Sequence, residues 1–146
     1  MNDYLKQRAR QHQEKRFATT WVAVEEGQTR VLGYLSLAMG SVIFEHADPE
    51  VFRGLPRHPM PVLHVARLAT DLTCQGKGIG SFLLGHAADV AIAASESMGV
   101  YALELLAVDV ETYDYYLRRG FLPLQGESMR LYAPVATLLA GRNPTP

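Results

Sequence analysis

The chain has 146 residues, 48% of which are hydrophobic, and a formal net charge of −1. This composition supplies the core of one domain and excludes a disordered chain. The near-neutral charge excludes a general electrostatic attraction to nucleic acid or anionic lipid, so an anionic partner has to meet a local basic patch.

The printed sequence carries no signal for secretion or membrane insertion. Residues 1–8 lack the apolar core of a signal peptide, and no apolar run is long enough to cross a membrane. Cys74 is the single cysteine, which excludes an intrachain disulfide, and no quartet of Cys and His typical of structural zinc is present. We expect a cytoplasmic protein without a metal site or a membrane partner.

The first half of the chain predicts a helix, a hairpin and an irregular segment. Residues 2–15 contain no Gly or Pro and begin with two side chains that can cap a helix. Strand-like runs at 20–25 and 30–39 are joined by a short turn that contains glycine, which is typical of a β-hairpin. Prolines interrupt the pattern over 40–61, where we expect a loop with a short helix near 49–53.

The second half alternates strands and helices. Its longest helix is indicated by apolar residues at steps of three or four from Ile79 to Ala94, and Gly99 ends the pattern. The element order predicts one mixed α/β domain over 1–146, with a central sheet and flanking helices. The predicted elements are a strand over 62–70, a helix over 79–94, a strand over 100–108, a helix over 111–119, one or two strands within 121–134, and a frayed tail over 141–146.

A glycine-rich loop separates the strand over 62–70 from the longest helix. Such a loop presents backbone N–H groups at a helix N-terminus, where the missing side chains and the helix dipole favour an anion. The pattern therefore indicates a phosphate site, with an ordinary turn that binds no ligand as the alternative. The loop residues are Gln75, Gly76, Lys77, Gly78, Ile79, Gly80 and Ser81.

Two common nucleotide-binding patterns do not fit this loop. A P-loop needs Ser or Thr after its lysine, whereas Gly78 follows Lys77, and the dinucleotide pattern lacks its third glycine. The loop does fit Gln-x-x-Gly-x-Gly. A second pattern, Tyr-x-x-x-Gly-Phe, runs from Tyr116 to Phe121 at the end of a predicted helix. The two patterns, with a helix and a strand between them, resemble the GNAT acetyltransferase superfamily.

The resemblance implies a GNAT fold, acetyl-CoA as cosubstrate and transfer of an acetyl group to a primary amine. It implies that backbone groups of Leu68 and Thr70 pair with the pantetheine arm like an added strand. The loop, which begins at Gln75, would hold the pyrophosphate through backbone N–H groups over 76–81. Tyr116 would protonate the departing thiolate.

The two patterns leave the general base open. Side chains alternate along the strand over 62–70, and His64 on one face could act as a base through water; a hydrogen-bonded sheet histidine is the alternative. Glu45 and Glu104 are weaker candidates. An aminoacyl ester amine is less basic than an alkyl amine, so a side-chain base is optional for that substrate.

Two further residues adjoin the motifs. Cys74 is interpreted as a small packing residue, because no His–Asn set accompanies it as in cysteine nucleophiles. Asp109 stands where many relatives carry Asn, which weakens the case for a cofactor contact there.

Other stretches resemble a narrower group, the GNAT toxins of bacterial toxin–antitoxin pairs, which acetylate the amino group of aminoacyl-tRNA. Relatives usually have a leading strand before an Asn-x-Tyr-Leu helix, whereas the printed sequence starts at that helix. Either the strand lies upstream or this member lacks it. The resemblance implies aminoacyl-tRNA as acceptor and a cognate antitoxin, and it allows a homodimer. The matching stretches are Asn2–Leu5, Ala18–Val24, Gly33–Leu37, Pro61–Leu63, Ala66–Asp71 and Met129–Tyr132.

A tRNA acceptor requires cationic contacts to phosphate, although the same charges can form a solvated surface with no partner. The candidate basic residues are Lys6, Arg8, Arg10, Lys15, Arg16, Arg67, Arg118 and Arg119.

Two other functions stay open at this level. The same chemistry could act on a small-molecule amine or a protein N-terminus, and an acidic substrate cleft would favour that function. A regulatory module that binds acyl-CoA without catalysis is the other, and the presence of Tyr116 argues against it. The sequence does not specify the acyl chain length or the oligomeric state.

Overall fold

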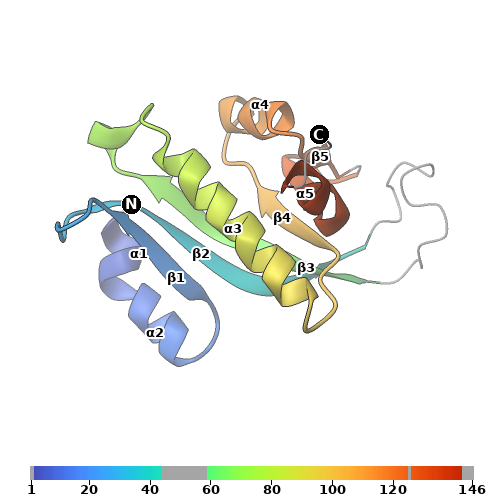
Figure 1. Cartoon of the computed structure of the whole chain (residues 1–146), viewed down its shortest axis with the longest axis horizontal. Coiled ribbons are helices and arrows are strands. Elements are labelled where there is room, and N and C mark those ends of the chain that lie inside the picture. Colours follow the sequence, from blue (N-terminus) through green and yellow to red (C-terminus); the bar gives the residue numbers. More distant parts are fainter. Residues whose placement is uncertain (1, 44–58, 125, 143–146) are drawn as a thin grey trace. The chain divides into compact units, whose positions relative to one another are not determined.

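The computed structural model in Figure 1 describes residues 2–43, 59–124 and 126–142. Its strands form one mixed six-stranded sheet in the order β1-β2-β3-β4-β6-β5, which confirms the predicted α/β class. None of the helices in these described ranges is both long and apolar enough to cross a membrane. The elements are α1 (Asn2–Gln7), α2 (Ala9–Glu14), β1 (Thr19–Val24), β2 (Val31–Val42), β3 (Met60–Thr70), η1 (Leu72–Cys74), α3 (Ile79–Ser95), β4 (Ala102–Leu106), α4 (Val110–Arg118), β5 (Leu122–Pro123), β6 (Arg130–Pro134) and α5 (Val135–Arg142).

The chain divides into two compact units. Unit 1 comprises Met1–Met39 and Val65–Val90, and unit 2 comprises Gly40–His64 and Ala91–Pro146. The boundary crosses β2, β3 and α3, because each of these elements contributes residues to both units. A single domain over 1–146 stays a prediction.

The helix predicted over 2–15 is wrong as a single element, because the chain forms α1 and α2 with a break at Arg8. Arg8 has φ −126° and ψ −27°, away from helical values. In an unbroken helix, side chains five residues apart point about 140° apart. The break lets both Tyr4 and Ala9 join one buried cluster with Tyr34 of β2. Burial of these two side chains therefore outweighs helix continuity.

The predicted hairpin of unit 1 is confirmed. β1 and β2 pair antiparallel, with Trp21 opposite Leu35. The Gln28 N–H donates to the Glu25 carbonyl at 2.9 Å, and Gly27 has a φ of +77° in the turn. Because a left-handed backbone favours glycine, this turn is specified by its local sequence.

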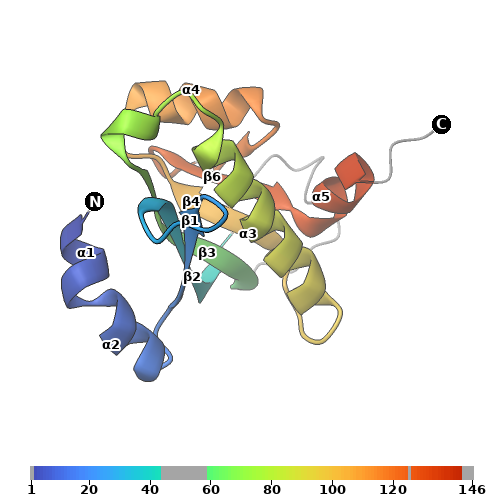
Figure 2. The ribbon, with the colours of Figure 1, turned by 60° about the vertical axis from the view of Figure 1, so that its left-hand side comes forward.

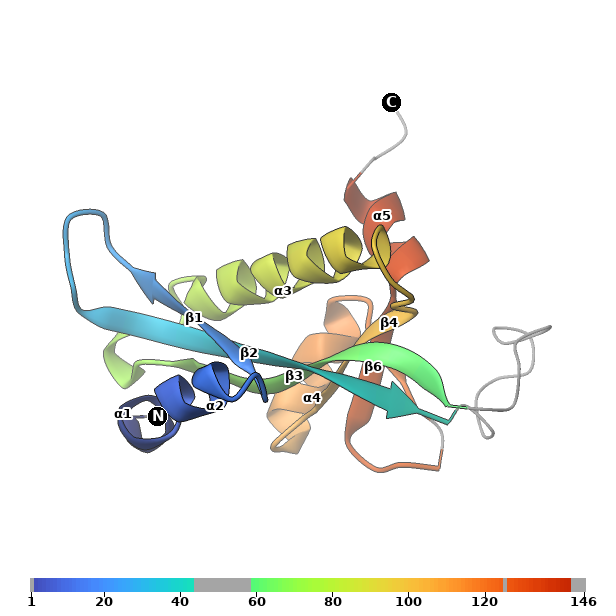
Figure 3. The same ribbon diagram turned by 90° about the horizontal axis from the view of Figure 1, so that it is seen from below.

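Helices of the same unit cover both faces of this hairpin. Figures 2 and 3 show α1 and α2 on one face of β1 and β2, and the first part of α3 on the other. β2 alternates accordingly: Tyr34 stacks on Tyr4 of α1 with ring centroids 5.8 Å apart, and Gly33 faces α3. A Cβ atom at Gly33 would lie 3.0 Å from Ile79 and 3.1 Å from Leu83. The absence of a side chain at Gly33 therefore sets how closely α3 approaches the strand.

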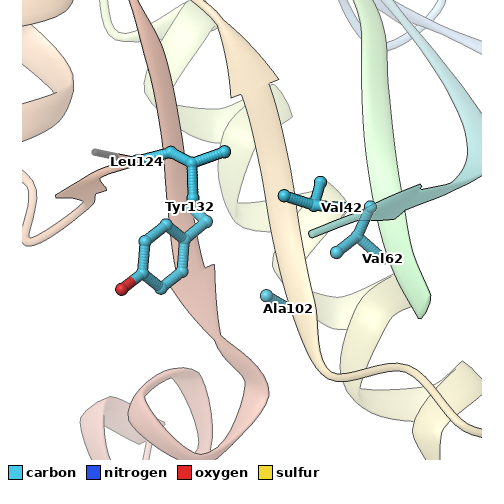
Figure 4. Close-up of a cluster of buried hydrophobic side chains, with 5 residues drawn as sticks. All are labelled: Val42, Val62, Ala102, Leu124 and Tyr132. Carbon is cyan, nitrogen blue, oxygen red and sulfur yellow. The ribbon is translucent and has the colours of Figure 1, made fainter. Parts of the chain in front are cut away.

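Unit 2 is built on antiparallel pairing of β4 with β6 and of β5 with β6. Figure 4 shows its buried apolar cluster, which joins Val62 of β3, Ala102 of β4 and Tyr132 of β6 with Val42 and Leu124. Alternation along a strand places residues two apart on one face. The cluster therefore packs against the same faces of β3 and β4 that carry His64 and Glu104, each two residues further along its strand.

The described chain ends in α5, which is not predicted from the sequence. Its Ala and Leu content favours a helix, and the Val135 N–H donates to the Tyr101 carbonyl at 2.8 Å where the helix begins. The helix includes Gly141 and Arg142, so the frayed tail predicted over 141–146 is wrong at these two positions. The short helix predicted near 49–53 lies outside the described residues.

Candidate active site

The glycine-rich loop follows β3 in unit 1 and is anchored by Asp71. The Asp71 carboxylate accepts hydrogen bonds from the Thr73 N–H at 2.9 Å and the Thr73 hydroxyl at 2.6 Å. The Arg30 guanidinium donates to the same carboxylate at 3.3 Å and to the Thr73 hydroxyl at 2.7 Å. The hydrogen bonds from Thr73, with the nearby Arg30 charge, lower the pKa of Asp71. The side chains of Arg30, Asp71 and Thr73 thus hold the first residues of the loop in place, whereas its later residues depend on glycine.

The loop backbone has the form that an anion site needs. Gly76 and Gly78 have φ of +83° and +82°, and among the described residues no atom beyond the two flanking residues lies within 4 Å of a Cβ built on either. Backbone conformation, not space, therefore requires glycine at both positions. The Phe82 N–H donates to the Gly78 carbonyl at 2.9 Å as α3 begins, and the Lys77 N–H donates to the Cys74 carbonyl at 3.3 Å. N–H groups in the first turn of a helix have no acceptor inside it, so this end of α3 can hold an anion.

A hollow of about 430 Å³ opens beside the loop in unit 1. Arg30 and Lys77 bring positive charge to its wall, and Glu25 brings a negative charge. The sequence does not predict this hollow, because it joins the hairpin turn to a loop far along the chain. The thiol of Cys74 is buried and free, which agrees with a packing role. The lining residues are Glu25, Gln28, Arg30, Leu32, Thr73, Cys74 and Lys77.

The second motif closes α4 in unit 2 and buries its tyrosine. Gly120 has a φ of +93°, and beyond it the Phe121 N–H donates to the Tyr116 carbonyl at 3.1 Å. The turn returns Phe121 onto Tyr116, with ring centroids 5.5 Å apart. Tyr116 is 6% exposed, and its burial, with a smaller effect of Tyr115, raises its pKa to about 12. The hydroxyl is therefore protonated at neutral pH and can donate.

Asp109 caps the helix that carries Tyr116. Its carboxylate accepts a hydrogen bond from the Thr112 N–H at 2.7 Å, at the N-terminus of α4. Hydrogen bonds from the side chain and backbone of Thr112 lower the pKa of Asp109. A capping pattern, Asp followed three residues later by Thr, was readable in the sequence, and it explains the residue without a cofactor contact.

Two of the three base candidates meet in unit 2. His64 Nδ1 lies 2.7 Å from Glu104 Oε2, and the two residues are 40 positions apart in the chain. Arg130 Nε lies 3.4 Å from the other oxygen of Glu104. The sequence presents His64 and Glu104 as separate candidates, because nothing local indicates that their strands are neighbours. Glu45 lies outside the described residues.

The predicted site residues are divided between the two units. Leu68, Thr70 and the whole loop over 75–81 belong to unit 1, whereas Tyr116 and His64 belong to unit 2. Within unit 1, a Cβ on Gly80 would lie 3.6 Å from the Thr70 hydroxyl, so the loop returns close to the end of β3. Within unit 2, Tyr116 is held by its own helix end.

This fold and these two motifs define an N-acetyltransferase, and comparison with known proteins gives the same class. Residues 2–121 match the Acetyltransferase (GNAT) family, and the chain belongs to this family. It is 35% identical, over 121 residues, to a tRNA-acetylating toxin of Mycobacterium tuberculosis (strain ATCC 25618 / H37Rv), covering 83% of this chain and 71% of that protein.

Solved structures of two toxins are also similar. A tyrosine-to-phenylalanine variant of KacT superposes with a TM-score of 0.87 and 27% identity, covering 94% of this chain and 83% of that chain. A tyrosine-to-phenylalanine variant of AtaT, bound to the C-terminus of the antitoxin AtaR and to acetyl-CoA, superposes with a TM-score of 0.76 and 25% identity. The match covers 94% of this chain and 80% of that chain. The expected GNAT fold is thus confirmed by sequence and by structure.

Proposed function

We propose that this chain uses acetyl-CoA to acetylate the α-amino group of an aminoacyl-tRNA in the cytoplasm, and that a cognate antitoxin binds it. The observation that carries the proposal is the 35% identity to a tRNA-acetylating toxin across 83% of the chain. The AtaT complex with AtaR and acetyl-CoA supports the same donor and the same kind of partner. A homodimer stays a prediction.

The donor is held by backbone in unit 1. Loop N–H groups over 76–81 bind the pyrophosphate, and the backbone of Leu68 and Thr70 pairs with the pantetheine arm. The left-handed Gly76 and Gly78 support this assignment, because they give the loop the backbone turn that leads into the N-terminus of α3. Lys77, in the wall of the neighbouring hollow, adds a positive charge beside the loop.

Tyr116 supplies the proton for the leaving group. The amine attacks the thioester carbon, the C–S bond breaks, and the hydroxyl of Tyr116 protonates the departing sulfur. A pKa of about 12 supports this role, because it keeps the hydroxyl protonated throughout the neutral range. Burial among aromatic rings also restricts where the hydroxyl can lie.

The acceptor is held by the basic surface of unit 1, which consists of Lys6, Arg8, Lys15 and Arg16 around α1 and α2, with Arg67 of β3. The Arg67 guanidinium lies 4.2 Å from the centroid of the Tyr4 ring while the residue stays exposed. A stacked guanidinium is pre-oriented for phosphate. Arg10 is excluded from this surface, because it forms an ion pair with Glu14 at 3.0 Å. Arg118 and Arg119 belong to unit 2, where Arg119 stacks on Tyr115.

The direct test is thiol release from acetyl-CoA with aminoacyl-tRNA, a peptide N-terminus and spermidine as competing acceptors. We expect rapid thiol release only when aminoacyl-tRNA is the acceptor. The product should be an N-acetylated aminoacyl-tRNA. Efficient acetylation of spermidine or the peptide without any reaction of aminoacyl-tRNA would contradict the proposed acceptor.

The basic surface is tested by reversing Arg8 and Lys15 together to Glu. Affinity for aminoacyl-tRNA should fall, and the slope of its logarithm against the logarithm of salt concentration should flatten by about 0.9 for each phosphate that the protein no longer neutralises. CoA affinity should not change. The matched control exchanges the same two residues as Arg8→Lys and Lys15→Arg, which conserves charge. Equal tRNA affinity in both double variants would show that the surface does not bind the acceptor.

A further inference from the structure

We propose that His64 is the general base that takes a proton from the attacking amine, and that Glu104 is the positioning residue that holds its ring. This inference rests on the proposed function, because it concerns the same transfer. It is carried by the direct hydrogen bond between two side chains on the neighbouring strands β3 and β4.

The carboxylate of Glu104 decides which nitrogen of His64 is available. A carboxylate only accepts hydrogen bonds, so Nδ1 carries the hydrogen and donates it to Oε2 at 2.7 Å. In the neutral ring, Nε2 then holds the lone pair and is the nitrogen that can take up a proton. The same bond restrains rotation of the ring. The arrangement is that of a carboxylate that orients a catalytic imidazole.

The two side chains differ in exposure in the way this role requires. The side chain of Glu104 is 3% exposed, whereas that of His64 is 34% exposed. The orienting group is therefore shielded from water, and the ring is accessible to a substrate amine or to one bridging water. A histidine that only formed a structural hydrogen bond in the sheet would not need this exposure to solvent.

The charge of Glu104 is balanced without competition for its bond to His64. Arg130 Nε lies 3.4 Å from Glu104 Oε1 and 3.0 Å from Glu127 Oε2. Neither contact has hydrogen-bond alignment, because Glu104 Oε1 and Arg130 Nε both lack a hydrogen-bond partner among the described residues. Among the described residues, the hydrogen bond that orients the Glu104 carboxylate is therefore the one to His64. Burying a carboxylate is costly, and an apolar pair would serve packing better.

The reaction balances with these two groups. The neutral amine attacks the thioester carbon, forming the C–N bond as the C–S bond breaks. One of the two amine hydrogens passes as a proton to His64 Nε2, and the other stays on the amide. Tyr116 gives its hydroxyl proton to sulfur, which leaves as the thiol. A proton moving from the imidazolium to the tyrosinate through solvent restores both residues.

The test compares His64→Gln, Glu104→Gln and wild type by kcat/KM between pH 6 and 9, with aminoacyl-tRNA and with a glycine ester as acceptors. The ring contacts Glu104 on β4, which lies 3.4 Å from Arg130 on β6, and Arg130 in turn pairs with Glu127. In His64→Gln we expect about a hundredfold loss of kcat/KM at pH 7, and the acid limb that remains should be the one from protonation of the acceptor amine itself. In Glu104→Gln we expect a smaller loss, in kcat and not in KM, because the ring loses the carboxylate that orients it. CoA affinity by calorimetry should stay constant in both variants.

The matched control is His86→Gln, a histidine of α3 in unit 1 whose ring packs on Trp21. It should keep the wild-type kcat/KM at pH 7. Free imidazole should restore activity to His64→Ala, which a packing role would not allow. An unchanged profile in His64→Gln, with aminoacyl-tRNA still acetylated, would overturn the base assignment and leave the proposed function standing. A loss of kcat/KM in His64→Gln with the glycine ester, when aminoacyl-tRNA is not acetylated by the wild type, would support the base and contradict the tRNA acceptor.

Discussion

The glycine loop of unit 1 and the His64–Glu104–Arg130 cluster of unit 2 differ in what determines their structure. The loop offers backbone N–H groups, and its shape depends on glycines at positive φ within one short stretch of sequence. The cluster offers side chains from three strands, including two residues 40 positions apart. One depends on local conformation, and the other depends on strand pairing.

This difference predicts how each region responds to substitution. A backbone site tolerates a change of side chain but not a change of φ, because its ligand contacts are main-chain groups. A side-chain cluster tolerates neither removal of a partner nor removal of charge, because a buried carboxylate is then left without compensation. Gly78→Asp tests the loop side of this contrast, and three further measurements test Tyr116 and the packing around Gly33.

The largest effect is expected for Gly78→Asp. The substitution forces a residue with a Cβ into a φ of +82° and places a carboxylate in an anion site. Like charges in contact cost several kcal/mol, so CoA affinity should fall by about a thousandfold. Isothermal calorimetry measures it. Lys77→Ala is the matched control and should cost about tenfold or less, because it removes only a side-chain charge; equal decreases in both variants would contradict a backbone site.

The next effect concerns Tyr116→Phe, which removes only a hydroxyl. We expect kcat to fall by between about tenfold and a thousandfold, with CoA affinity and thermal stability retained. Single-turnover thiol release gives the rate of the chemical step. Expression of the wild type in cells should arrest growth, and the variant should relieve the arrest. A kcat equal to that of wild type would leave Tyr116 as a packing residue of α4.

A smaller, purely structural effect is expected for Gly33→Ala. The new Cβ would lie 2.8 Å from the Ala69 carbonyl oxygen and 3.0 Å from Ile79, so β2, β3 or α3 has to move. Overpacking of this kind lowers the free energy of unfolding by about 1–3 kcal/mol. Urea denaturation measures it. Gly85→Ala on α3 is the control, because no described atom outside its own helix backbone lies within 4 Å of the added Cβ, and it should be neutral or stabilising by up to about 1 kcal/mol.

The smallest effect is expected from the raised pKa of Tyr116, because its hydroxyl stays protonated throughout the neutral range. Its pKa is raised to about 12, above the unfolded value of 10.0, so the native state favours the protonated form. This contribution to stability is complete below pH 10 and disappears as pH rises through about 12. Tyrosinate absorbance of wild type minus Tyr116→Phe should therefore titrate near pH 12. A difference titration near pH 10 would contradict the burial of this hydroxyl.

The sequence predicted the turns whose conformation is local. Gly76, Gly78 and Gly120 all have positive φ, because left-handed turns and helix ends are specified by the residues that form them. The ligand of the loop and the role of Tyr116 stay predictions. The helix over 2–15 was wrong for the opposite reason. Helix propensity is a weak preference, and burial of Tyr4 and Ala9 against Tyr34 broke the helix at Arg8.

By itself, then, the sequence determined the α/β class, both family motifs and the family, because periodicity and turn chemistry act over a few residues. The tertiary structure alone decided that His64 and Glu104 form one hydrogen-bonded pair. It also decided that Arg67 is stacked on Tyr4. The physical reason is that strand order and helix packing join residues far apart in the chain, and no local pattern records which strands become neighbours.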